Sequence, residues 1–382
     1  MGARNGTLED LVMFGEVFAG ERVFVTGNTG FKGAWLAYWL TRLGADVTGY
    51  ALDPPTNPSL FEALDLAGQL QHLHGDVRDR DRLVAEVKAA APTVIFHLAA
   101  QALVRRAYVS ASDTFETNVM GTVNVLEAAS ACPSVRAVVI VTTDKVYQNL
   151  ETGTPFREGD ALGGTDPYGA SKGAAELVTA AYRASFFGDG AAIASARAGN
   201  VIGGGDWAPD RIIPDSVRAL VAGEPIIVRN PDAIRPWQHV LEPLSGYLQL
   251  AAILLAEGSR FAGAWNFGPT EERSDEPVRW VVDQFIEQWG SGSWTSYQGA
   301  EAQPHEAQRL SLDSAKAWEQ LGWATVWDSR TAVGRTAAWY REYYRAPDRA
   351  RNLVDDDLAA YLADANVAGR HWAVAEARGA TA

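Results

Sequence analysis

The sequence predicts an α/β fold: a doubly wound parallel sheet with a smaller C-terminal lobe. Short apolar runs alternate with segments of helical periodicity through residues 1–199, a pattern typical of a parallel sheet covered by helices on both faces. A turn rich in glycine follows the first apolar run. After Gly199, glycine, proline, aspartate and tryptophan become frequent and the helical segments become shorter, which indicates a separate lobe.

The individual elements follow from the same periodicity. We expect a first domain at 1–199, with 238–257 returning to it, a lobe that mainly binds substrate at 200–345, and an extension of unknown role at 346–382. Strands are predicted at 22–26, 45–51, 93–98, 137–142 and 191–198, and helices at 31–43, 80–90, 113–131 and 168–187. The tail beyond residue 346 is rich in alanine, aspartate and arginine and has no recognisable function.

Composition excludes several classes of function. The chain has 382 residues, a hydrophobic content of 47% and a net charge of −14, so nucleic acid and anionic membranes are not expected partners. A single cysteine, Cys132, excludes an internal disulfide framework and a cysteine metal cluster, and no metal is expected. We find neither a signal peptide nor 18 consecutive apolar residues, so the cytoplasm is the expected compartment.

The glycine-rich turn has the spacing of a dinucleotide-binding loop. It lies between the first expected strand and helix, where its backbone N–H groups can approach a pyrophosphate at a helix N-terminus. This context makes it more than a structural turn, and predicts a Rossmann-type cofactor site. The residues of the loop are Gly27, Asn28, Thr29, Gly30, Phe31, Lys32 and Gly33.

Further cofactor residues are expected where the next strands end. Asp53, about 20 residues past the loop, is a candidate for the adenosine ribose and would favour NAD over NADP; otherwise it is a turn residue. Asp76, followed by Val77, either accepts from the adenine amino group or caps a loop. Ala99 is small enough to let the cofactor approach, whereas His97 beside it is expected to be a packed, hydrogen-bonded residue.

Tyr168 and Lys172 are the expected chemical centre. At positions i and i+4 they project from one face of a helix. An ammonium nearby is expected to lower the pKa of the phenol, so that tyrosine can act as a base for an alcohol. The lysine can also hold the nicotinamide ribose. Thr143, at the end of the strand 137–142, can hydrogen-bond the same substrate oxygen.

Asp144 and Lys145 follow Thr143 directly. An acid and a potential base in adjacent positions suggest proton transfers beyond simple oxidation. The alternative is a capped strand end with an exposed ion pair. A lysine acts as a base only when neutral, which requires a depressed pKa; otherwise Lys145 stabilises negative charge on the substrate, and both roles stay open.

These segments resemble the extended short-chain dehydrogenase/reductases, and within them the sugar-nucleotide 4,6-dehydratases, above all the branch acting on CDP-glucose. The resemblance covers about residues 20–345. It rests on the segments 27–33, 49–55, 143–145, 198–207 and 235–239. Asp144-Lys145 matches the CDP-glucose branch, whereas many relatives have Asp-Glu; Val146 departs from that branch, which often has cysteine there.

The resemblance implies a reaction in three stages with bound NAD. Tyr168 takes the C4 hydroxyl proton as hydride leaves C4, Asp144 protonates the departing C6 hydroxyl after loss of the C5 proton, and hydride returns to C6. It also implies a homodimer formed by the helices 113–131 and 168–187. For the nucleotide sugar, it points to side chains that suit a diphosphate and a sugar: Gln101, Arg105, Asn200, Arg211 and Arg235.

Three other functions remain possible. The substrate could be another nucleotide sugar, and a 4-epimerase would use the same Tyr168–Lys172 pair, although it needs no acid–base pair after Thr143. A protein of another class, an NAD-binding sensor without activity, would be expected to lose Tyr168, Lys172 or Thr143, all of which are present.

Overall fold

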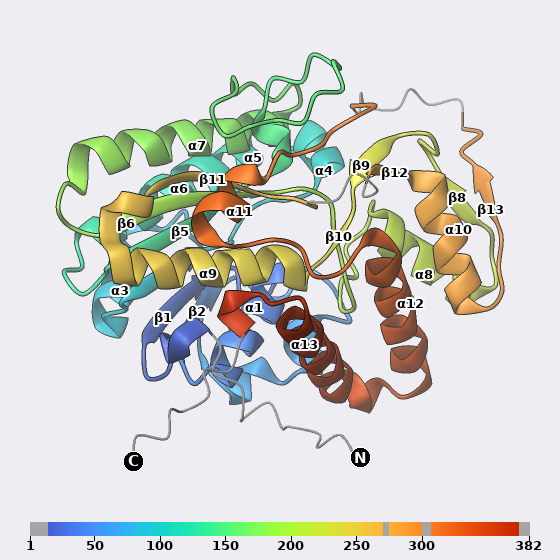
Figure 1. The fold of residues 1–382 in the computed structure, drawn as a ribbon, viewed down its shortest axis with the longest axis horizontal. Coiled ribbons are helices and arrows are strands. Elements are labelled where there is room, and N and C mark those ends of the chain that lie inside the picture. Colours follow the sequence, from blue (N-terminus) through green and yellow to red (C-terminus); the bar gives the residue numbers. More distant parts are fainter. Residues whose placement is uncertain (1–13, 270–274, 300–306, 374–382) are drawn as a thin grey trace.

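A seven-stranded parallel sheet forms the centre of the computed structural model, which describes residues 14–269, 275–299 and 307–373 (Figure 1). Its order is β11-β6-β5-β4-β1-β2-β3 and every pair is parallel. The predicted fold class is therefore confirmed. The strands are β1 (Arg22–Thr26), β2 (Asp46–Ala51), β3 (Gln71–His74), β4 (Val94–His97), β5 (Ala137–Val141), β6 (Ala192–Ala198) and β11 (Gly263–Phe267).

The strand order reverses between β1 and β4, which are neighbours in the sheet. At such a switch point the connections leave to opposite faces, and a crevice forms at the carboxyl ends of the strands. The glycine-rich turn after β1 and the segment after β4 both lie at this edge. The sheet's topology thus places the expected cofactor loop where doubly wound folds bind ligands.

Helices cover both faces of the sheet. They are α1 (Phe31–Arg42), α2 (Leu60–Ala63), α3 (Arg80–Ala90), α4 (Val104–Val109), α5 (Ala111–Phe115), α6 (Gly121–Ser130), α7 (Pro167–Phe186), α8 (Ile212–Ala222), α9 (Leu241–Glu257), α10 (Val278–Trp289), α11 (Ala315–Leu321), α12 (Ser329–Arg345) and α13 (Ala350–Val367). The helix expected at 113–131 is continuous from Ala111 to Ser130, and it contains one π-helical segment, Glu116–Met120, between α5 and α6. None of the helices described here is long and apolar enough to cross a membrane.

Alternate strand residues divide the apolar core into two layers. In β1, Val23 and Val25 belong to the cluster formed with α1, α9 and α13, whereas Phe24 belongs to the cluster formed with α3 and α6. Side chains of a strand point alternately to the two faces, so both faces of the sheet are buried. This explains why the strands are continuous apolar runs in the sequence.

Three small two-stranded pairs lie outside the main sheet. They are β7 (Val201–Ile202) with β10 (Gln238–His239), β8 (Ile226–Val228) with β13 (Trp294–Ser296), and β9 (Ile234–Pro236) with β12 (Asp275–Pro277). α9, which lies in the segment 238–257, packs against β5 and β6 of the main sheet. The five strands predicted from the sequence include neither β3 nor β11, and β11 joins the sheet from beyond α9.

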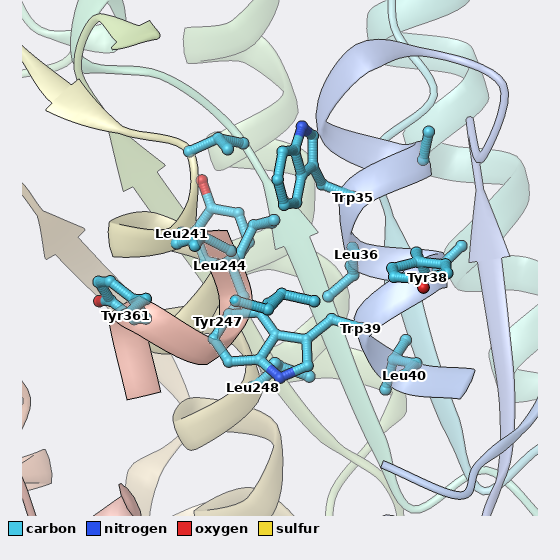
Figure 2. Close-up of a cluster of buried hydrophobic side chains, with 14 of the residues drawn as sticks. Trp35, Leu36, Tyr38, Trp39, Leu40, Leu241, Leu244, Tyr247, Leu248 and Tyr361 are labelled. Atoms are coloured by element: carbon cyan, nitrogen blue, oxygen red, sulfur yellow. The ribbon is translucent and has the colours of Figure 1, made fainter. Parts of the chain in front are cut away.

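α13, in the part of the tail beyond residue 346 that the structure describes, packs beside α1 and α9 (Figure 2). Tyr38 of α1 donates to Asp355 of α13 at 2.8 Å, and Tyr361 of α13 donates to Glu242 of α9 at 2.8 Å. The rings of Trp39 of α1 and Tyr361 meet edge to face with 6.2 Å between their centroids, and Figure 2 shows side chains of α9 beside both. The tail thus completes the apolar layer over α1 and α9.

Candidate active site

The glycine-rich loop is built for close approach of a ligand. Gly27 has a φ of +76°, and a Cβ there would lie 2.6 Å from the backbone nitrogen of Ala99. A Cβ on Gly33 would lie 2.0 Å from the carbonyl oxygen of Gly27, so α1 can pack onto the loop only with glycine there. A Cβ on Gly30, by contrast, would lie 3.5 Å from its nearest atom among the described residues, the carbonyl oxygen of Gly27. Two of the glycines therefore shape the turn, and the third leaves space above it.

The loop also presents unused hydrogen-bonding groups. Among the described residues, no side chain caps the N-terminus of α1, so its first backbone N–H groups can bind an anion. Asn28 is fully buried and its Oδ1 has no partner among the described residues. These features fit a dinucleotide whose pyrophosphate lies over Gly30. The described residues contain no group of histidine, cysteine or acidic side chains suited to a metal ion.

The candidate adenosine residues differ in how free they are. Asp53 lies just after β2, its side chain is 90% exposed, and its nearest partner is His74 at 3.5 Å. The carboxylate of Asp76 instead accepts from the side chain of Arg78 at 2.6 Å and from its backbone N–H at 2.9 Å. Asp76 thus has partners within its own loop, whereas Asp53 is exposed, and a contact of either residue with the adenosine stays a prediction.

Ala99 and Val77 lie near the carboxyl ends of the strands, where the cofactor is expected. The backbone N–H of Ala99 donates to Thr26 at 3.2 Å, and Val77 is buried. His97 bonds Thr26 at 2.7 Å and Thr122 at 3.3 Å. Burial lowers the pKa of His97 to about 3, so it is the packed, neutral histidine that the sequence predicted.

Tyr168 begins the helix that carries the chemical centre. Asp166 caps α7 by accepting from the backbone N–H groups of Tyr168 and Gly169 at 2.9 and 3.0 Å. The phenol is 9% exposed, and burial raises its pKa to about 12, against the lowering effects of a hydrogen bond with Thr143 and the charge of Arg211.

The expectation that Lys172 lowers the pKa of Tyr168 is wrong for this structure. The ammonium of Lys172 donates to the carbonyl of Val141 at 3.0 Å, and the side chains that lower the pKa of Tyr168 are Thr143 and Arg211. Burial lowers the pKa of Lys172 itself to about 8, while the charge of Glu176 raises it. In a buried site, desolvation of the phenolate outweighs a lysine that is bonded elsewhere.

Glu176 belongs to a buried network behind the lysine. It pairs with Arg197 at 2.8 Å, with side chains only 3% and 4% exposed, and it accepts from the hydroxyls of Ser195 and Thr142. Glu176 follows Lys172 by one helical turn, so the spacing was visible in the sequence. Its partners lie in β6 or directly after β5, and their proximity to Glu176 was not visible in the sequence.

Asp144 and Lys145 form an ion pair with unequal burial. Asp144 is fully buried, and its Oδ1 accepts from Lys145 Nζ at 3.1 Å and from the hydroxyl of Thr143 at 2.9 Å. Its Oδ2 is buried and has no partner among the described residues. Asn200 lies 3.5 Å from Lys145 Nζ. The ion pair is therefore held next to Thr143. Its acid, Asp144, is buried and has one oxygen without a hydrogen-bond partner among the described residues.

The predicted substrate residues divide into two groups. Arg211 pairs with Asp206 at 2.8 Å and acts electrostatically on Tyr168, and Asn200 contacts Lys145, so both lie at the chemical centre. Arg105 pairs with Asp210 at 3.4 Å. Arg235 is buried and bonds the carbonyl of Ile234 at 2.8 Å. The Gln101 side chain is used in bonds to Leu103 and Thr114.

Asn118 supports the centre from the π-helical segment. Its side chain donates to Ser171 at 2.8 Å and accepts from the backbone N–H of Gln101 at 2.8 Å. Such segments are frequent at functional sites, because the extra residue re-aims side chains. Sequence reasoning missed Tyr247 of α9, a fully buried phenol whose pKa burial raises and whose neighbours include Tyr168 and Asp144. No sequence pattern marked it.

Comparisons with known proteins agree with this geometry. The model of the GDP-mannose 4,6-dehydratase family matches residues 24–336. The chain is 48% identical over 336 residues to CDP-glucose 4,6-dehydratase of Salmonella typhimurium, covering 86% of this chain and 93% of that one. It is 30% identical over 329 residues to dTDP-glucose 4,6-dehydratase of Streptomyces griseus, covering 84% and 94%.

Solved structures show the same fold. The dTDP-glucose 4,6-dehydratase DesIV of Streptomyces venezuelae, solved with bound NAD, superposes with a TM-score of 0.73 at 28% identity, over 86% of this chain and 99% of that one. UDP-glucose 4-epimerase of Stenotrophomonas maltophila, at 22% identity, shares the fold with a TM-score of 0.74. The resemblance inferred from the motifs is confirmed, and the chain belongs to the GDP-mannose 4,6-dehydratase family of sugar-nucleotide enzymes.

Proposed function

We propose that this protein is an NAD-dependent CDP-glucose 4,6-dehydratase that forms CDP-4-keto-6-deoxyglucose. The observation that carries the proposal is the ion pair of Lys145 with the buried Asp144, beside Thr143 and Tyr168. An epimerase needs only the tyrosine–lysine pair, whereas water loss needs a further acid and base. The identity of 48% to the Salmonella enzyme supports CDP-glucose as the substrate.

The cofactor site follows from the loop geometry. The backbone of the loop from Gly27 to Gly33 would hold the pyrophosphate, Asp53 the adenosine ribose, and Lys172 the nicotinamide ribose. Bound NAD⁺ would accept hydride from C4 of the sugar and later return it to C6. Tyr168 would take the proton of the C4 hydroxyl, with Thr143 orienting that oxygen.

The ion pair can supply both groups for the elimination. If the proton of Lys145 passes to Asp144, the pair becomes a neutral amine beside a neutral carboxylic acid. The amine then takes the C5 proton and Asp144 gives its proton to the leaving C6 hydroxyl, so that one water departs and the pair is again charged.

The substrate would bind on the side of the second lobe. Arg211 lies near Tyr168, and its planar guanidinium suits a phosphate oxygen. Part of its hydrogen-bonding capacity is already used by Asp206. Asn200 would orient Lys145. The three other candidates each have bonds within the protein, so their contact with the substrate stays a prediction: Arg105, Arg235 and Gln101.

Product analysis tests the function. The full-length protein is incubated separately with CDP-, dTDP-, UDP- and GDP-glucose and each mixture is examined by mass spectrometry. We expect loss of one water from CDP-glucose and little reaction with the others. An unchanged product mass would indicate a 4-epimerase, preference for another nucleotide would refute the CDP assignment, and binding without turnover would indicate a sensor.

Variants of the ion pair test the assignment of the acid and the base. Lys145→Met is expected to stop the exchange of the C5 proton with deuterated water and to accumulate a 4-keto-glucose nucleotide that retains its C6 oxygen. Asp144→Asn is expected to slow water loss while C5 exchange continues. Loss of exchange in both variants to the same extent would contradict the division of roles.

We infer that two chains associate through α5, α6 and α7. Several apolar side chains on and near these helices are exposed, and together they suit a symmetric interface: Tyr108, Val109, Phe115, Met120, Leu177 and Phe186. A Phe115→Glu/Met120→Glu variant should shift the molar mass measured by light scattering from that of a dimer to that of a monomer. A parent chain that is already monomeric would refute this proposal.

We also propose that the protein is located in the cytoplasm. Recovery of the protein in a membrane fraction would refute that location.

A further inference from the structure

Lys32 belongs to the phosphate-binding loop, but its ammonium lies at the chemical end of the site. It is the second residue of α1, and its Nζ lies 5.9 Å from the centre of the Tyr247 ring on α9. The charges that act on it are those of Lys172, Arg211, Asp144 and Lys145. A lysine from the loop therefore extends toward the groups that carry out hydride and proton transfer.

Its neighbours are already committed to other partners. Lys172 donates to a backbone carbonyl, Arg211 pairs with Asp206, and Lys145 pairs with Asp144. Within the described part of the chain, Lys32 has no hydrogen-bond acceptor, and its one aromatic contact is with Tyr247. Burial and the surrounding cations lower its pKa to about 7. The site thus holds an excess of positive charge at its reactive end.

We propose that Lys32 is a positioning residue whose charge disfavours oxidised nicotinamide relative to reduced nicotinamide, and so promotes hydride uptake from C4 of the sugar. The inference rests on the proposed NAD function. NAD⁺ and NADH share the adenosine, the ribose groups and the diphosphate, and they differ in the positive charge of the nicotinamide ring. An ammonium at the reactive end therefore acts on their difference, whereas the glycine loop binds both alike.

Binding measurements isolate this effect. The full-length chain, freed of nucleotide, is titrated with NAD⁺ and with NADH at pH 6.5 by calorimetry. Lys32→Met keeps the length of the side chain and removes its charge. We expect the ratio Kd(NAD⁺)/Kd(NADH) to fall roughly tenfold or more, as a unit charge at ~6–8 Å implies for an effective dielectric constant of about 20. Lys32→Arg keeps the charge and should retain the parental ratio.

A remote lysine provides the matched control. Lys316 donates to the carbonyl of Ala264 at 2.7 Å and lies over the Trp265 ring, away from the loop, so Lys316→Met should leave the ratio unchanged. The parental ratio should also decrease as the pH rises through the Lys32 pKa of about 7. In Lys32→Met that decrease should be absent or smaller, because Lys172, with a pKa of about 8, titrates in both proteins.

Each of the other outcomes overturns either the inference about Lys32 alone or the proposed NAD function with it. Equal changes in both dissociation constants of Lys32→Met would show a contact with the shared diphosphate and overturn the inference alone. An unchanged ratio in Lys32→Met, or the same change in Lys316→Met, would also overturn it. A parent chain that binds neither nucleotide would overturn the proposed NAD function and the inference together.

Discussion

The buried pair of Arg197 and Glu176 makes a sharp prediction about stability. The guanidinium donates to Glu176 at 2.8 Å, to the hydroxyl of Tyr147 at 2.8 Å and to the carbonyl of Glu158 at 3.1 Å. The two charged side chains are 4% and 3% exposed, so water does not screen their interaction. Arg197→Met would leave the carboxylate buried without its closest cation.

The expected loss of unfolding free energy is about 3–5 kcal/mol, the cost typical of breaking a buried pair from one side. Two hydroxyls, from Ser195 and Thr142, still donate to Glu176 in the variant, which places the loss toward the lower end of that range. Removing both charges, in Arg197→Met/Glu176→Gln, eliminates the uncompensated charge. The double variant should therefore be more stable than the sum of the single losses predicts, by about 1–3 kcal/mol.

Urea unfolding, followed by tryptophan fluorescence, measures the parent, both single variants and the double variant at pH 7.5. Arg197→Met with a loss below about 1 kcal/mol would place this pair with the weak, screened pairs of protein surfaces. Strict additivity in the cycle would show that the two charges do not interact. Either result would refute the reasoning from burial.

Three further predictions concern the loop, the base and a buried acid. Gly33→Ala should abolish NAD binding or folding, because its Cβ would overlap the Gly27 carbonyl, whereas Gly30→Ala should fold normally by circular dichroism. Tyr168→Phe should reduce kcat by about 10²–10⁴ with little change in the Kd for NAD⁺; undiminished turnover would exclude it as the base. Burial raises the pKa of Glu242 to about 7, so the folded state binds its proton more tightly than the unfolded state, and stability should fall by up to about 3 kcal/mol as the pH rises from 4.5 to 7. Glu242→Gln should flatten that part of the urea-unfolding profile, and an unchanged profile would contradict the assignment.

Local sequence patterns were sufficient for most of the sheet domain. The helix at 80–90 has its predicted bounds, and the five predicted strands lie within two residues of the observed ones. Strands buried on both faces are continuous apolar runs, and glycine turns mark where they end. β3 and β11 were not among the predicted strands, and the pairing of β11 with β6 joins segments far apart in the chain.

The candidate site shows the same division. Thr143, Asp144 and Lys145 adjoin one strand end, and Tyr168 and Lys172 share one helix face, so their association could be predicted from spacing. The pKa values could not, because they depend on burial and on charges from distant segments. Lys172 is bonded to Val141, and burial instead governs the pKa of Tyr168.

The sequence by itself determined the class of fold, and it predicted the cofactor loop and the residues of the chemical centre, since each of these is a pattern within one or two elements. Only the tertiary structure decided what surrounds each charge. It placed Lys32 of the loop against Tyr247 and the catalytic cations, and it completed the layer over α1 with α13. These contacts join residues far apart in the chain, and the free energy of a buried charge depends on all the groups around it.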